Sequence, residues 1–158
     1  MDAVVIERVD PESPDAAWCL AEFVAILAER FPNGFDPTRS APADPELFRP
    51  PGGAFLVAYL HGSPVGCGAL KTDGAGVGEI KRMWVAGSAR GHGLGRRILS
   101  ALEDEARARG VRELRLETNG TLVEARGLYE SAGYAVIDRF GDDPYAEHWF
   151  GKQLPRLE

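Results

Sequence analysis

Glycine is distributed very unevenly along this chain of 158 residues. Twelve of its 19 glycines lie between Gly52 and Gly95, more than twice the share that an even distribution would give. Glycine accommodates tight turns, left-handed backbone and the close approach of neighbouring segments. We therefore expect unusual backbone geometry in the middle third of the chain, with short elements joined by tight connections.

Three segments inside this window, the first of them almost continuously apolar, predict an antiparallel meander of strands. They are residues 54–60, 65–71 and Val77–Val85. The sequence His61-Gly62-Ser63-Pro64 separates the first two, and residues 72–76 separate the second from the third. Both connections are rich in the residue types that form tight turns.

The residues before the window predict a strand, a helix and a loop. Val4–Val9 is a short apolar strand, and a helix follows with Ser13 as its N-cap and Pro14 at its first position. Apolar residues at helical spacing continue this helix to Phe31. Residues 31–53 contain six prolines, which predicts a loop with one short helical turn near residues 46–48. We interpret this loop as a substrate-side loop or a lid.

The residues after the window change to helical spacing. Apolar residues from Leu94 onward predict a helix that stops at Gly110, and residues 111–118 predict a strand. Residues 121–124 form a capping box that opens a short helix ended by Gly133. Residues 134–140 and 148–154 are the last predicted strands.

This order of elements predicts a mixed α/β (α+β) fold, with a mostly antiparallel sheet of six to seven strands flanked by about four helices. The length suits a single domain over residues 1–158. Hydrophobic residues make up 44% of the chain and charged residues 27%. These ordinary values exclude collagen-like, disordered and disulfide-scaffold classes.

The charge distribution reverses locally. Residues 81–102 carry five Lys and Arg and no Asp or Glu, whereas the other 136 residues carry thirteen basic and 24 acidic side chains. A general nucleic-acid-binding protein would be basic more broadly, so this class is not expected. A small basic segment in an acidic chain favours one compact anionic ligand. The alternative is a solvated helix face.

A glycine loop begins the helix at the end of this basic segment. The sequence Arg90-Gly91-His92-Gly93-Leu94-Gly95 follows a predicted strand and supplies no good side-chain cap for the helix N-terminus. The first backbone N–H groups of a helix have no internal partner, so together with the nearby arginines they predict a phosphate or pyrophosphate site. The spacing fits neither a Walker loop nor a dinucleotide fingerprint.

Two motifs together resemble the GNAT superfamily of N-acetyltransferases. Glu79-Ile-Lys-Arg-Met-Trp-Val85 followed by the loop resembles the family's acetyl-CoA motif, with Arg90, Gly93 and Gly95 at the fixed positions of [QR]-x-x-G-x-[GA]. The sequence Leu128-Tyr-Glu-Ser-Ala-Gly-Tyr134 resembles the family's later helix and strand. The two motifs cover residues 54–154, whereas the first 50 residues match only in outline.

The resemblance implies a single N-acetyltransferase domain with the GNAT fold, in which the strands Val77–Val85 and 111–118 splay apart. Acetyl-CoA would bind there as cosubstrate, with its pyrophosphate on the glycine loop and its pantetheine arm along the backbone of the splayed strand. The implied cofactor-binding residues are Met83, Trp84, Val85, Arg90, Gly91, His92, Gly93, Leu94, Gly95, Arg96 and Asn119. Asn119 has the alternative role of capping the next helix.

The resemblance also implies catalytic residues for direct transfer of an acetyl group to an amine. An alkylammonium group has to lose a proton first, and Glu79 matches the family's strand glutamate that acts as base. The alternative for Glu79 is a carboxylate paired with Lys81 or Arg115, and His148 and His92 are weaker candidates for the base. Tyr129 matches the family's tyrosine acid, which protonates the departing thiolate. Its alternative role is a core tyrosine.

The amine acceptor is the part that the sequence specifies least. The acidic and aromatic segment before the last strand lies near the acceptor in this family, and its candidate residues are Asp142, Asp143, Tyr145 and Trp149. The alternative is a solvated turn. Arg49 and the proline-rich loop would instead suit a carboxylate on the acceptor. The acceptor is a small molecule or a protein lysine or N-terminus, and a non-catalytic acyl-CoA-binding module is the alternative function.

The remaining expectations concern location and assembly. Cys19 and Cys67 are the only cysteines and have no metal-ligand spacing, and no apolar run approaches the length of a membrane span. The N-terminus has no signal-peptide pattern. We therefore expect a cytoplasmic protein with no metal, no nucleic acid and no membrane among its partners. Members of the family are often dimers, which favours a homodimer.

Overall fold

The computed structural model describes residues 4–31, 44–89, 93–118, 123–141 and 143–155. They form one seven-stranded sheet in the order β1-β2-β3-β4-β5-β7-β6. The β4–β5 pair is parallel and the other five neighbouring pairs are antiparallel. The strands are β1 Val4–Val9, β2 Gly53–Leu60, β3 Ser63–Thr72, β4 Val77–Val85, β5 Glu113–Thr118, β6 Ala135–Val136 and β7 His148–Gln153.

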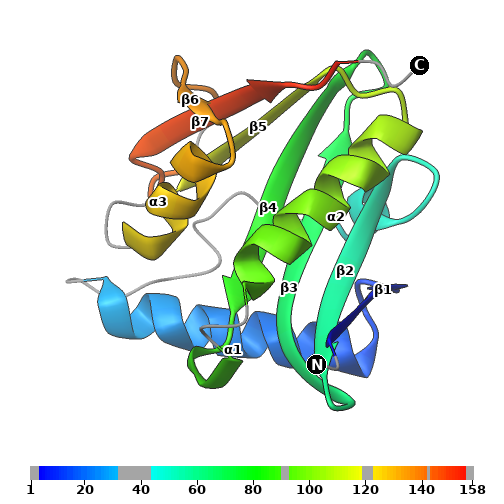
Figure 1. Cartoon of the computed structure of the whole chain (residues 1–158), viewed down its shortest axis with the longest axis vertical. Helices are drawn as coiled ribbons and strands as arrows, with labels where there is room; N and C mark the ends of the chain where they lie inside the picture. The colour runs from blue at the N-terminus through cyan, green and yellow to red at the C-terminus, as the bar shows by residue number, and fades with distance from the viewer. Residues whose placement is uncertain (1–3, 32–43, 90–92, 119–122, 142, 156–158) are drawn as a thin grey trace.

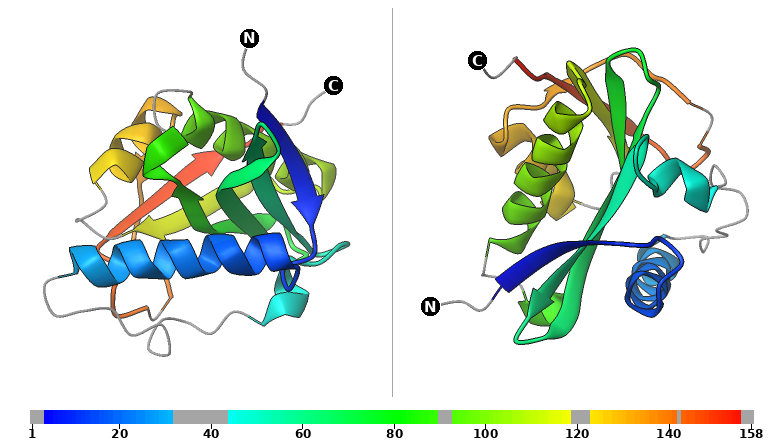
Figure 2. Two further views of the ribbon diagram at one scale, coloured as in Figure 1. Left: turned by 90° about the horizontal axis from the view of Figure 1, so that it is seen from below. Right: turned by 90° about the vertical axis from the view of Figure 1, so that its right-hand side faces the viewer.

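Helices cover both faces of the sheet. The α-helices are α1 Pro14–Arg30, α2 Leu94–Ala108 and α3 Val123–Ser131, and the 3-10 helices are η1 Pro45–Phe48 and η2 Gly87–Ala89. Helix α1 lies on one face, whereas α2 and α3 lie on the other (Figure 1; Figure 2). This three-layer arrangement confirms the predicted mixed α/β fold with a mostly antiparallel sheet.

Two hydrophobic clusters fill the two interfaces. The larger joins α2 to the sheet and includes Leu70, Ile98, Leu102 and Leu114, all fully buried or nearly so. The smaller joins α1 and η1 to the opposite face of β2 and β3, and it includes Cys19 and Phe55 among others. Because side chains alternate along a strand, membership of a cluster shows which face of the sheet each strand residue occupies.

Helix α2 packs unusually close to β3 because β3 offers glycine there. A Cβ added at Gly66 would lie 2.8 Å from the Trp84 carbonyl oxygen and 2.9 Å from Ile98. At Gly68 an added Cβ would lie 2.7 Å from Leu102. Part of the glycine excess therefore serves close packing of a helix on the sheet, as the sequence suggested for strand glycines.

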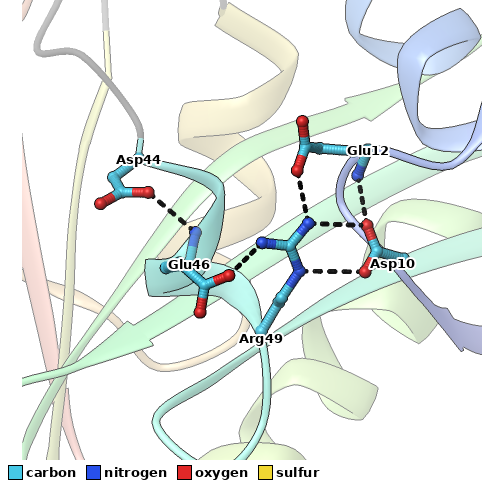
Figure 3. A network of polar contacts seen from close by, with 5 residues as sticks. All are labelled: Asp10, Glu12, Asp44, Glu46 and Arg49. Carbon is cyan, nitrogen blue, oxygen red and sulfur yellow. Dashed lines mark hydrogen bonds and ion pairs between the residues drawn. The ribbon is translucent and has the colours of Figure 1, made fainter.

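The start of α1 follows the sequence prediction. Ser13 Oγ accepts a hydrogen bond from the Ala16 N–H at 3.3 Å, and Pro14 occupies the first helical position. Arg49, just after η1, binds Asp10, Glu12 and Glu46 and so fixes η1 against the β1–α1 turn (Figure 3). These contacts place the first turn of α1 relative to the sheet.

The region after α3 differs from the prediction. Residues 134–140 were expected to form a strand, but only Ala135 and Val136 pair with β7. Ile137 still donates its N–H to Trp149 O at 2.9 Å, after which the chain leaves the sheet edge. The apolar residues of this segment suggested a buried strand, but Val136 lies on an edge strand and is 77% exposed. An apolar residue here therefore does not indicate burial.

About four helices were expected. The described residues contain three α-helices and two short 3-10 helices. The predicted capping box at residues 121–124 lies partly outside the described residues. Within the described ranges, no helix is both long and apolar enough to cross a bilayer.

Candidate active site

A β-bulge in β4 decides which way the candidate site residues point. Lys81 pairs with Ala69 and Trp84 pairs with Cys67, so Arg82 and Met83 together oppose the single residue between them on β3. Arg82 has a left-handed φ of 56°, and its carbonyl accepts a hydrogen bond from Cys67 Sγ at 3.2 Å. One extra residue therefore shifts the side-chain alternation of β4 at this point.

The shift distributes neighbouring side chains to opposite faces. Met83 and Val85 pack against the cluster under α2 and α3, whereas Trp84 packs against the cluster under α1. On the α1 side, the Trp84 ring meets the Trp18 ring edge-on at 5.9 Å between centroids. The end of β4 thus contributes walls to both sides of the sheet.

Strands β4 and β5 separate before β4 ends. Their pairs are Val77–Glu113, Gly78–Leu114 and Glu79–Arg115, and the described residues of the two strands form no pair beyond these. The two ribbons diverge from the upper part of the view in Figure 1. This confirms the predicted fold feature of a splayed central strand pair.

The separation leaves an edge of β4 without a neighbouring strand. The Ala86 N–H donates to Val65 O at 2.8 Å, so the N–H of Ala86 points toward β3. The N–H and C=O of successive residues in an extended strand point to alternate sides. The N–H and C=O of Val85 therefore point the opposite way, into the gap. An extended ligand could pair with this edge like an added strand.

A cavity of about 760 Å³ occupies this gap. Its lining comes from α1 on one face of the sheet, from residues 83–89 and 93–96, and from Ala125, Leu128 and Tyr129 of α3 on the other face. Because both faces contribute, the cavity reaches from one face of the sheet to the other beside the end of β4. Two ligands entering from opposite faces could meet inside it.

The N-terminus of α2 opens into this cavity. Gly93 has a left-handed φ of 67° and makes no side-chain cap, so the first N–H groups of α2 are not taken by a side chain. Arg96 lines the cavity and donates to Ser131 Oγ at 2.7 Å. A Cβ at Gly95 would lie 3.0 Å from Leu128, so glycine also lets α3 approach. The arrangement suits an anion beside the helix end.

Tyr129 forms part of the cavity wall from the α3 side. It is 5% exposed, and its hydroxyl lies 3.9 Å from the Met83 sulfur. Burial raises the pKa of the Tyr129 phenol well above its ordinary value. The hydroxyl therefore keeps its proton at neutral pH, and the structure brings Tyr129 together with the predicted Met83, Val85 and glycine-loop residues.

Glu79 lies in an ion-pair cluster on the α1 face. Its Oε1 is 3.2 Å from Arg115, and its Oε2 is 3.3 Å from Lys71 and 3.9 Å from Lys81. These include both partners that the alternative interpretation of Glu79 named. Glu79 belongs to the last β4–β5 pair and is not part of the cavity lining.

The predicted acceptor residues are placed around a turn before β7. Asp143 Oδ1 accepts the Tyr145 N–H at 2.9 Å, and the Tyr145 ring contacts Phe31 at 5.0 Å. The Trp149 indole N–H donates to Phe140 O at 3.0 Å. Asp143 therefore helps to shape the turn itself.

Arg49 is engaged elsewhere. The three carboxylates that its guanidinium contacts hold the pKa of Arg49 above the ordinary value (Figure 3). An acceptor carboxylate at Arg49 would have to displace these partners. Five further predicted site residues lie outside the described residues, namely Arg90, Gly91, His92, Asn119 and Asp142.

The sequence did not point to the α1 wall of the cavity. Trp18, Glu22, Phe23, Ile26 and Arg30 all line it. A signal was present, because Trp18, Phe23 and Ile26 are large apolar residues away from the stripe that was assigned to the core. A second apolar face on a surface helix indicates a binding wall only once its position beside β4 is known.

Comparisons with known proteins show the family and the fold. Residues 20–134 match the Acetyltransferase (GNAT) family. The chain is 37% identical over 146 residues to a protein of Azospirillum brasilense named IAA acetyltransferase, with 92% of each chain covered. The fold matches a GNAT-family acetyltransferase from Staphylococcus aureus with a TM-score of 0.80 at 19% identity, covering 97% of this chain and 100% of that one.

A second solved structure carries a ligand. It is yncA from Salmonella typhimurium with its cofactor acetyl-CoA, which matches with a TM-score of 0.69 at 22% identity and covers 98% of this chain and 96% of that one. At this identity the likeness concerns the fold. The family match spans most of the chain, and together with the curated relative it settles the classification: the chain belongs to the Acetyltransferase (GNAT) family and is an acetyl-CoA-dependent acyltransferase.

Proposed function

We propose that the protein moves the acetyl group of acetyl-CoA directly to a primary amine while both substrates are bound, within a single domain over residues 1–158. The observation that carries this proposal is the cavity beside the end of β4, which has walls on both faces of the sheet. A donor reaching in from the α2–α3 face and an acceptor from the α1 face would meet there without a covalent enzyme intermediate.

The donor side is built from backbone groups and arginines. The free edge of β4 at Met83, Trp84 and Val85 would pair with the pantetheine arm, and the N-terminus of α2 would take the pyrophosphate. The glycine-loop residues Arg90, Gly91 and His92 belong to this site in the proposal, as do Gly93–Arg96 and Asn119. The size of the cavity and the uncapped helix end support it.

Tyr129 is the proposed acid for the departing thiolate. It lies on the cavity wall beside Met83, and burial keeps its phenol protonated. The oxygen of the attacked thioester needs a hydrogen-bond donor as it becomes negative, and a backbone N–H on the separated part of β4 would supply it. Both groups would then act from the donor side of the sheet.

The acceptor side is proposed to be the α1 wall and the turn before β7. Trp18 and Phe23 give it aromatic surface, and the turn adds Asp142, Asp143, Tyr145 and Trp149. A primary amine on a small molecule fits this mixture of aromatic and acidic groups, and an exposed lysine or N-terminus of a protein carries the same chemistry.

The test is a thiol-release assay with acetyl-CoA and a panel of amines, peptides and IAA, the last because a relative carries that name. Parallel runs with propionyl- and succinyl-CoA define the donor. We expect turnover with at least one amine and with acetyl-CoA preferred. Binding of CoA without turnover on any acceptor would instead favour a non-catalytic acyl-CoA-binding module, and turnover on IAA alone would exclude an amine.

A further inference from the structure

A second glutamate, Glu117, lies beyond the last pair of β4 and β5, and like Glu79 it is not among the residues that line the cavity. It is on β5, two residues beyond Arg115, whose pair with Glu79 is the last between the two strands. Leu114, Leu116 and Thr118 of β5 face the α2 side and are buried. By alternation, Glu117 faces the other side of the sheet, the side of α1.

The carboxylate of Glu117 is incompletely partnered. Its side chain is 13% exposed, and Oε1 lies 3.6 Å from Lys81 Nζ across the gap. Its Oε2 is buried and accepts no hydrogen bond from the described residues. A buried carboxylate oxygen without a partner is costly, which makes it a site that a cation or a hydrogen-bond donor would occupy favourably.

The neighbouring turn approaches this oxygen through a glycine. Gly141 faces Glu117, and a Cβ built there would lie 3.4 Å from Oε2. Asp143 is near enough to act on Glu117 electrostatically, and Glu117 pairs with Trp149 in the β5–β7 ladder. Glu117 thus joins the end of β5 to the acidic and aromatic turn of the proposed acceptor side.

Glu79 is different in this respect. Both of its oxygens contact cations, from Lys71, Lys81 and Arg115. An incoming ammonium group would have to compete with three resident cations at Glu79, but among the described residues only with Lys81 at Glu117. Glu79 therefore holds the ion-pair cluster together, whereas Glu117 keeps one carboxylate oxygen that no described residue contacts by a hydrogen bond.

The groups around Glu117 also suit proton transfer. Burial raises the pKa of the Glu117 carboxyl, and the negative charges of Asp143 and Glu79 raise it further. Lys81 and, less strongly, the Trp149 indole act in the opposite direction. A carboxylate whose pKa lies above its ordinary value is a better proton acceptor near neutral pH than an exposed one.

We propose that Glu117 binds the ammonium group of the acceptor and takes its proton, so that Glu117 and not Glu79 is the general base. This inference rests on the proposed function, because it presupposes an amine acceptor. Lys81 is a positioning residue that holds Glu117 Oε1 and leaves Oε2 to the acceptor.

The proton and electron balance of the step is complete. The ammonium group gives one proton to Glu117, and the lone pair so freed forms the C–N bond to the thioester carbon. The C–S bond breaks with its electron pair on sulfur, and the thiolate takes the proton of Tyr129. The second proton leaves the nitrogen and restores Tyr129 through water, while Glu117 releases the first proton to solvent.

The experiment compares three isosteric variants on the best amine of the acceptor panel. Glu117→Gln should lower kcat/KM for the amine by about a hundredfold or more, the usual loss of a general base. Glu79→Gln should lower it far less. Glu113→Gln is the matched control, since Glu113 is on the same strand and its carboxylate accepts a hydrogen bond from the Gln153 side chain at 3.1 Å. The Kd of acetyl-CoA should be unchanged in all three.

The pH profile separates a base from a structural carboxylate. In the wild type, kcat/KM for the amine should fall toward low pH as Glu117 becomes protonated. Lys81→Met should move this acidic limb to higher pH, because removing the cation favours the protonated form. Glu117→Gln should abolish the limb while its circular dichroism and acetyl-CoA affinity stay those of the wild type.

Each result decides the matter. A large loss in Glu79→Gln with little loss in Glu117→Gln overturns the inference and returns the role to Glu79. Equal small losses in both also overturn it and point to water as the base. If the wild type acetylates no amine at all, the proposed function fails and the inference fails with it. A wild type that is active beside a fully active Glu117→Gln removes the inference alone.

Discussion

At the residue scale, Tyr129 and Tyr134 are neighbours whose hydroxyls serve different purposes, one in the proposed reaction and the other in the stability of the fold. Tyr129 and Tyr134 meet at 6.0 Å between ring centroids, and both are buried. Their hydroxyls differ, since that of Tyr134 donates to Glu103 Oε2 at 2.8 Å, whereas that of Tyr129 lies at the cavity beside the Met83 sulfur. Removing each hydroxyl should therefore have a different consequence.

Tyr129→Phe should lower kcat by about a hundredfold, a typical effect of removing a general acid, without changing the KM of acetyl-CoA. The ring is kept, so the contacts with Phe150 and Tyr134 persist and the free energy of unfolding should change little. Steady-state kinetics with acetyl-CoA and the best amine measure this. A variant with full kcat would remove Tyr129 from the mechanism.

Tyr134→Phe is the matched control and should do the reverse. It leaves the buried Glu103 carboxylate with Lys152, at 3.0 Å, and without the hydroxyl. Hydrogen bonds to charged groups contribute about 1.5–3 kcal/mol, so the free energy of unfolding should fall by about that amount while kcat stays unchanged. Urea denaturation measures the first quantity. An unchanged midpoint would show that Lys152 alone suffices for Glu103.

At the scale of elements, the contact between α2 and β3 is set by backbone proximity. Gly66→Ala should lower the free energy of unfolding by about 1–3 kcal/mol, the usual cost of overpacking. Its Cβ would meet the Trp84 carbonyl oxygen, which belongs to the sheet and cannot yield. Gly68→Ala should cost less, because Leu102 is a side chain that can turn aside.

Gly52→Ala provides the control for this pair, since nothing lies within 4 Å of a Cβ there. Chemical denaturation of the three variants should rank Gly66→Ala as the least stable. Equal stability of Gly66→Ala and Gly52→Ala would show that the Trp84 carbonyl and Ile98 accommodate the added Cβ without cost.

At the scale of the whole molecule, charge is segregated along an acidic chain of net charge −6. The basic residues 81–102 include the walls of the donor site, so the affinity for CoA should depend on salt. We expect the Kd of CoA to rise severalfold between low salt and a concentration at which the Debye length falls below about 10 Å. Titration calorimetry measures this, and dephospho-CoA, with one phosphate fewer, should respond less. A Kd independent of salt would contradict electrostatic capture.

Local patterns in the sequence were sufficient for most of the fold. Ser13 and Pro14 predicted the start of α1, and the predicted strand Val77–Val85 has the bounds of β4. These features depend on neighbours in the sequence, where capping and alternation act. The predicted strand at residues 134–140 was wrong because an edge position is a property of the sheet and not of the segment.

The candidate site was less predictable for the same physical reason. The family motifs indicated Tyr129 and the glycine loop, and the structure brings Tyr129 to the cavity. Lys71, the partner of Glu79 that was not expected, comes from β3, and the α1 wall comes from a helix some 60 residues earlier than the Met83–Ala86 wall it faces. Such long-range contacts leave no periodic signal, so neither could be read from spacing.

The bulge at Arg82 and Met83 has a consequence for how this protein can change over generations. The allocation of Met83 to one face and Trp84 to the other depends on whether the count of residues in β4 is odd or even. Deleting a single residue there would exchange the two walls at once, although no side chain had been replaced. Single substitutions in the cavity lining can therefore accumulate one at a time during evolution. Insertions and deletions in β4 cannot, because each would change the faces to which Met83 and Trp84 point.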